Sequence, residues 1–129
     1  MAFMSWFKFK KRAVSEKDID ISKISPKNRD GDCYAAAANY VIDNAILRGN
    51  KNLMLVHGDV TGQGPIAGII YGHAWVEDGN MVIDVSNGRN IQLPKFLYYA
   101  IGRISNTVSY TAKEVQEKLL ETKKYGPWQ

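Results

Sequence analysis

The chain has 129 residues, of which 45% are hydrophobic and 23% charged, and its net charge is +4. This length predicts one domain with one core, and the composition excludes a disordered or fibrous chain. No apolar run reaches the roughly 20 residues that a membrane-spanning helix requires, and the mild basicity does not indicate a nucleic-acid partner. The single cysteine excludes an internal disulfide, so we expect a reducing, cytoplasmic location.

Residues 1–25 are interpreted as a basic N-terminal extension, and residues 26–129 as a single domain. The opening MAFMSWFKFKKR places its apolar residues before its basic ones, the reverse of a signal peptide, and contains no small-residue cleavage site. We therefore expect a basic tail, with a short interfacial membrane anchor as the alternative.

The stretch DGDCYAAAANYVIDNAILRGN, residues 30–50, predicts a helix. Its apolar residues recur at helical spacing, and Gly49-Asn50 is the expected end. Asp32 is the expected N-cap, which places Cys33 in the first turn. Unpaired backbone N–H groups and the helix dipole favour a thiolate there. A buried cysteine that serves as a small apolar residue is the alternative.

Three apolar stretches, residues 52–56, 66–77 and 80–86, predict strands. Asp78-Gly79, between the last two, is a strong hairpin signal. The glycine-rich segment HGDVTGQGP, residues 57–65, is expected to be a loop.

The C-terminal stretch 110–128 predicts a helix that begins with a capping box of Thr111 and Glu114. Residues 94–104 are compatible with either a helical turn or a strand. The order of a helix, several strands and a final helix predicts an α+β fold, in which the first helix packs on a mainly antiparallel sheet.

The hairpin brings a histidine and an aspartate together. If Asp78-Gly79 is a two-residue turn, Glu77 faces Asn80, and counting back along both strands places His73 opposite Asp84. Opposed side chains have Cβ atoms about 4.5–5.5 Å apart on one face. Asp84 would then accept a hydrogen bond from the imidazole, which fixes its tautomer and favours its protonated form. A purely structural His–Asp pair is the alternative.

Cys33, His73 and Asp84 have the residue types and chain order of a thiol nucleophile, a general base and an orienting carboxylate. Backbone N–H groups at the start of the helix are expected to hold the oxyanion, with Asn28 as a candidate side-chain donor. His57 is expected to be an ordinary strand-end residue, with a place in the cleft as the alternative.

No cofactor is expected. The histidines and the cysteine lack the spacing of metal ligands. The segment GQGPIAG, residues 62–68, touches the dinucleotide-binding pattern, but it contains Pro65 and is not followed by the helix that would hold a phosphate.

These residues resemble the transglutaminase-like branch of the papain-like cysteine hydrolase superfamily. The stretch GHAWVE…VIDVS, residues 72–86, is similar to the His-Ala-Trp-x-Glu strand and following Asp strand of that branch, and DCYAAA occupies the nucleophile's place. The resemblance implies Cys33 as nucleophile, His73 as general base and Asp84 as orienter, with Trp75 as a candidate substrate-binding residue. Small leader peptidases of lasso-peptide biosynthesis are similar in length and spacing.

The implied function is hydrolysis of a peptide or isopeptide amide bond through a thioester acyl-enzyme, with a peptide or protein as substrate and no cofactor. Transglutamination or glutamine deamidation through the same thioester is one alternative, since only the nucleophile that resolves the thioester differs. A catalytically silent peptide-binding domain of the same fold is the other.

Overall fold

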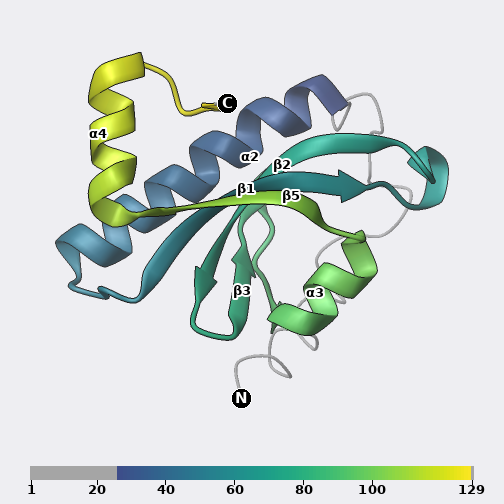
Figure 1. Ribbon diagram of the computed structural model, residues 1–129, viewed down its shortest axis with the longest axis horizontal. Coiled ribbons are helices and arrows are strands. Elements are labelled where there is room, and N and C mark those ends of the chain that lie inside the picture. Colours follow the sequence, from purple (N-terminus) through teal and green to yellow (C-terminus); the bar gives the residue numbers. More distant parts are fainter. Residues whose placement is uncertain (1–25, 129) are drawn as a thin grey trace.

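The computed structural model describes residues 26–128, with side chains from Cys33 onward, so the predicted extension at 1–25 lies outside the described residues. Five strands form one sheet in the order β4-β3-β2-β1-β5 (Figure 1). Every neighbouring pair is antiparallel. The predicted α+β class with an antiparallel sheet is therefore confirmed.

The strands are β1 (Leu53–Thr61), β2 (Ile70–Asp78), β3 (Met81–Asp84), β4 (Ile91–Pro94) and β5 (Ser105–Thr111). The helices are α2 (Pro26–Val41), which continues into the π-helical turn η3 (Ile42–Leu47), α3 (Lys95–Gly102) and α4 (Ala112–Thr122). Two 3-10 turns complete the fold, η4 (Gly64–Ile66) and η5 (Ser86–Gly88). The segment 57–65, which was expected to be a loop, instead lies mostly in strand β1. Strands β4 and β5 were not predicted. The stretch 94–104, which was compatible with a helical turn or a strand, contains α3.

The sheet has two different buried faces, because side chains alternate along each strand. On β2, Ala74 and Val76 pack in a cluster with Cys33 of α2, whereas Trp75 packs in a second cluster with Val82 of β3. Helices α2 and α4 cover the first face, and α3 lies against the second (Figure 1). We call these the α2 face and the α3 face.

The helix that carries Cys33 begins earlier than predicted. It starts at Pro26, so the prediction of Asp32 as N-cap is wrong, and Cys33 lies about two turns inside the helix. Proline suits a first helical position because the N–H it lacks would have no partner there, and an interior glycine such as Gly31 costs only about 1 kcal/mol. Backbone N–H groups inside a helix donate to carbonyls four residues earlier, so α2 does not form the expected oxyanion site at Cys33.

The β2–β3 hairpin turns one residue later than predicted. Asp78 pairs with Met81, which makes Gly79 and Asn80 the two turn residues. Gly79 has a φ of +61°, the left-handed conformation that a type II′ turn requires at its first central position. Glycine therefore takes the first turn position rather than the second.

The later turn shifts the strand register by two residues. Glu77 pairs with Val82, so the predicted direct opposition of His73 and Asp84 is wrong, and the two residues are diagonal neighbours. Because side chains alternate with a period of two, a two-residue shift leaves both on the same face. His73 and Asp84 can therefore still form the expected pair, although the predicted register was wrong.

The C-terminal helix begins as predicted. Thr111 Oγ1 accepts a hydrogen bond from the Glu114 backbone N–H at 3.2 Å, and Glu114 Oε1 accepts one from the Thr111 backbone N–H at 2.9 Å. This capping box joins β5 directly to α4. None of the helices between residues 26 and 128 has the length and apolarity needed to cross a membrane.

Candidate active site

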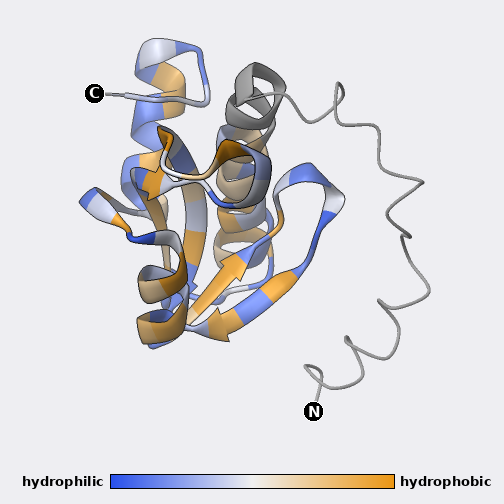
Figure 2. Cartoon of the chain, turned by 90° about the vertical axis from the view of Figure 1, so that its right-hand side faces the viewer, coloured by the Kyte–Doolittle hydropathy of each residue, from blue (hydrophilic) through white to orange (hydrophobic). Residues whose placement is uncertain are grey.

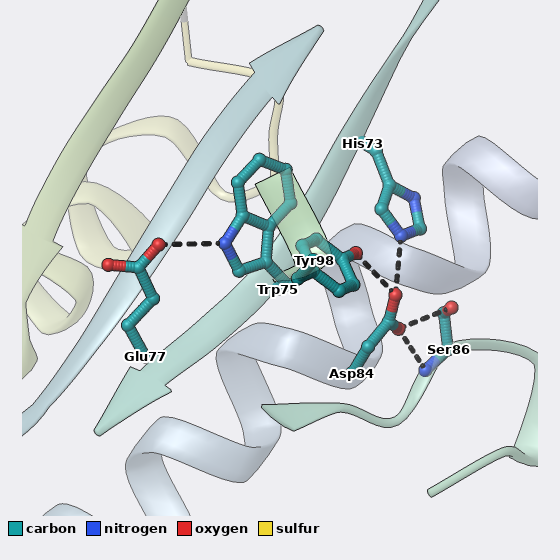
Figure 3. A network of polar contacts seen from close by, with 6 residues as sticks. All are labelled: His73, Trp75, Glu77, Asp84, Ser86 and Tyr98. Carbon is teal, nitrogen blue, oxygen red and sulfur yellow. Dashed lines mark hydrogen bonds and ion pairs between the residues drawn. The ribbon is translucent and has the colours of Figure 1, made fainter. Parts of the chain in front are cut away.

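The structure brings His73 and Asp84 together on the α3 face. Nε2 of His73 lies 2.9 Å from Oδ2 of Asp84, and both residues are buried, with exposed fractions of 4% and 3% (Figure 3). His73 comes from the middle of β2 and Asp84 from the end of β3. The expected histidine–aspartate pair therefore forms.

Three further donors hold the Asp84 carboxylate. Oδ1 accepts hydrogen bonds from the Ser86 backbone N–H at 3.0 Å and the Ser86 hydroxyl at 2.6 Å, and Oδ2 accepts one from the Tyr98 hydroxyl at 2.6 Å. Burial alone would raise the pKa of Asp84, but the hydrogen bonds and charge of His73, with those of Ser86 and Tyr98, outweigh it and hold the pKa well below its usual value. Asp84 is therefore ionised at neutral pH.

This ionised carboxylate determines which imidazole nitrogen carries the proton. An ionised carboxylate only accepts hydrogen bonds, so Nε2 of His73 must be the donor. Nδ1 then holds a lone pair in the neutral ring, and it is buried with no hydrogen-bond partner in the part of the chain that the structure describes. Such an orphaned buried atom calls for an explanation, and a catalytic role is one of the recognised ones.

Trp75 and Glu77 support the ring of His73 from the same strand. The ring centroids of the Trp75 indole and the His73 imidazole lie 6.0 Å apart, with 29° between the ring planes. Its Nε1–H donates to Glu77 Oε2 at 3.0 Å (Figure 3). The Tyr99 hydroxyl donates to the same oxygen at 2.5 Å, and Lys95 Nζ lies 3.2 Å from Oε1. Trp75 is fully buried, so it packs behind His73 instead of offering an exposed surface to substrate.

Cys33 lies on helix α2, which packs on the α2 face of the sheet. It is fully buried in the α2-face cluster, together with Ala74 and Ile83, which adjoin His73 and Asp84 in the chain. Helix α2 packs against both β2 and the turn η5 that follows Asp84. The side chain of Asn28, in the first turns of α2, lies outside the described part.

His57, the second histidine, also lies on the α2 face. It is 5% exposed, and neither ring nitrogen has a hydrogen-bond partner among residues 33–128. The rings of Tyr34, Tyr110 and Trp128 surround it at centroid distances of 4.8, 5.1 and 5.0 Å. Burial lowers its pKa to about 4. The prediction of a strand-end residue is therefore wrong: His57 is a core histidine in the middle of β1, and it does not line the pocket of His73.

Sequence reasoning missed two partners of Asp84. Ser86 follows it by two residues, a spacing at which aspartate commonly accepts hydrogen bonds from its own backbone, so a signal was present. Tyr98 reaches Asp84 from α3, and residues 94–104 had no assigned structure, so nothing in the sequence indicated that contact. No group of three or more His, Cys, Asp or Glu side chains in the described part could hold a metal ion.

No family model, curated protein or solved structure matches this chain.

Proposed function

We propose that the chain is a cysteine hydrolase of the transglutaminase-like branch of the papain-like superfamily, with Cys33 as nucleophile. The observation that supports it most is the state of His73. Its Nε2 is engaged by a buried, ionised Asp84, while its Nδ1 is buried without a partner in the described residues. With Nε2 bound to an ionised carboxylate, the lone pair of Nδ1 is left to accept a proton, which is what a general base requires.

In the proposed reaction, Nδ1 of His73 takes the proton of the Cys33 thiol, and Sγ attacks the amide carbon of a peptide. Asp84 stabilises the imidazolium and fixes its orientation. The imidazolium then gives its proton to the leaving amine, and a water molecule, deprotonated by Nδ1, hydrolyses the thioester. Resolution by an amine would instead give acyl transfer, and water attack on a glutamine thioester would give deamidation.

The reaction requires Sγ of Cys33 to meet Nδ1 of His73. Supporting this, α2 packs against β2 and the turn η5, so the helix that carries the thiol borders the strand of His73 and the turn that follows Asp84. Ala74, beside His73, shares the buried cluster of Cys33.

The test is the rate at which iodoacetamide labels Cys33 as a function of pH, in the wild type and in His73→Ala. A thiol paired with His73 reacts well below pH 8, and His73→Ala should move its reactivity to the range of an ordinary thiol, near pH 8.5. His57→Leu is the matched control: it removes the other buried histidine and should leave the labelling profile unchanged. Mass spectrometry of peptides incubated with the protein then separates cleavage from deamidation.

A catalytically silent peptide-binding domain is the second candidate. It is favoured by the full burial of Cys33 among apolar side chains, because structural cysteines in such surroundings are inert. A thiol that iodoacetamide labels only after the protein unfolds would overturn the hydrolase and leave the binding domain.

A further inference from the structure

A pocket of about 280 Å³ opens beside the histidine–aspartate pair on the α3 face. His73 and Asp84 line it, together with residues from the end of β1, from β4 and from α3. A pocket of this size accommodates a short chain or a single large side chain.

Aliphatic side chains form part of the pocket's walls. The side chains concerned are Val60, Ile66, Ile91, Leu93, Ile101 and Ile104. Ile101 is 48% exposed at the surface of α3, and apolar residues predominate along that helix (Figure 2). Burying an aliphatic chain against these walls is favourable by roughly 25 cal/mol for each Å² of apolar surface removed from water.

The polar groups of the pocket favour an anion. Arg89 is the only Lys or Arg side chain that lines it, and it forms no ion pair within the described part of the chain. The guanidinium and the Tyr71 hydroxyl both lie close enough to Tyr98 to influence its pKa, which burial raises most strongly. Arg89, which is exposed, and Tyr71 are thus two hydrogen-bond donors that line the pocket together with Tyr98.

Asp84 does not offer a competing site for a cation. Its two oxygens already accept four hydrogen bonds, from His73, Tyr98 and the backbone and hydroxyl of Ser86. A carboxylate has about four lone-pair sites, so none is left for an ammonium group. The aliphatic side chains favour an apolar chain as ligand. Arg89, which has no ion pair in the described residues, and Asp84, whose acceptor sites are filled, favour a negative charge on that ligand.

We propose that this pocket binds an aliphatic chain that carries a carboxylate, with the carboxylate on Arg89 and the chain against Leu93 and Ile104. Binding of this ligand to the pocket does not require the Cys33 thiol, which does not line it. Its use as a subsite for an aliphatic, acidic segment of the substrate rests on the proposed function.

The test is titration of the full chain with hexanoate, followed by calorimetry and by ¹H–¹⁵N NMR. Hexanoate should bind more tightly than acetate, which lacks the chain, and than hexylamine, which has the opposite charge. The shifted amide signals should be those of Tyr71, Arg89 and Ile104. Arg89→Gln should weaken hexanoate binding about tenfold, the loss expected for one charge-assisted hydrogen bond. Arg48→Gln, which removes an exposed arginine outside the pocket, should leave it unchanged.

Tighter binding of hexylamine, equal binding of acetate, shifts confined to other parts of the chain, or no binding of hexanoate would each overturn the proposal. The same titration on Cys33→Ser separates the two proposals. Unchanged hexanoate binding to Cys33→Ser, together with a thiol that resists iodoacetamide in the wild type, would keep the pocket and remove the hydrolase.

Discussion

The two histidines, His57 and His73, are equally buried but lie on opposite faces of the same sheet. His73 shares a polar network with Asp84, which is itself held by Ser86 and Tyr98. The ring of His57 lies among aromatic rings, and neither of its nitrogens has a partner between residues 33 and 128. The same side chain at the same depth is thus in one place a member of a polar network and in the other a packing element.

Burial alone therefore does not distinguish these two histidines. An imidazole in apolar surroundings is kept neutral by desolvation, as the lowered pKa of His57 shows. An imidazole bonded to an ionised carboxylate has a defined tautomer and a directed lone pair. The partner on the neighbouring strand, rather than the exposure of the ring, distinguishes the two sites.

The largest expected effect comes from replacing His73 with leucine. This change removes a hydrogen bond to a buried, ionised Asp84 and leaves that oxygen with only the Tyr98 hydroxyl. We expect the free energy of unfolding to fall by about 2–4 kcal/mol, because an under-satisfied buried carboxylate keeps its desolvation penalty. Urea unfolding at pH 7 measures the change. A loss below about 0.5 kcal/mol, the range of ordinary surface substitutions, would mean that the pair contributes nothing to the fold.

The next effect is that the free energy of unfolding depends on pH, over one pH window because of His57 and over a lower window because of Asp84. The pKa of folded His57 is lowered from 6.5 to about 4, so between these values the unfolded chain binds a proton that the folded protein excludes. Stability should therefore fall as the pH falls from about 6.5 to about 4, by up to about 1.4 kcal/mol per pH unit. The lowered pKa of Asp84 has its effect at lower pH: its contribution is complete above the ordinary value of 3.8 and is lost as the pH falls below it.

Urea unfolding measured from pH 7 to pH 3 checks both windows. His57→Leu should remove the slope of the upper window and leave the lower one. Asp84→Asn should do the reverse. An upper-window slope that persists in His57→Leu would assign it to other groups and remove the distinction between the two histidines.

The sequence predicted those parts of the fold that depend on local chemistry. The Thr111–Glu114 capping box begins α4 as expected, because a cap involves only residues within one turn. The start of α2 was misplaced, since Asp32 is a good N-cap by type but Pro26 is a better first helical residue. Strand β5 was missed because its partner β1 is distant in the chain and because β5 is mostly polar. Strand β4 was missed because it is only four residues long and ends at Pro94.

For the histidine–aspartate pair, the face of the sheet was predicted correctly and the strand register was predicted wrongly. His73 and Asp84 meet because a two-residue shift preserves the face of a strand. Cys33 was predicted in the first turn of its helix but lies about two turns inside it, because the helix begins at Pro26. The Tyr98 contact was not foreseen because α3 and β3 are brought together only by tertiary packing.

The smallest change in stability is expected for His57→Leu at pH 7. No hydrogen bond within residues 33–128 is lost, and two buried nitrogens that lack a partner there are replaced by apolar atoms of similar volume. We therefore expect a change in the free energy of unfolding within about 1 kcal/mol, in the stabilising direction, opposite in sign to that of His73→Leu. Urea unfolding of both variants measures the contrast. If His57→Leu destabilised the protein as much as His73→Leu, the imidazole of His57 would have to form hydrogen bonds in solution, and the two histidines would no longer differ in their contribution to the fold.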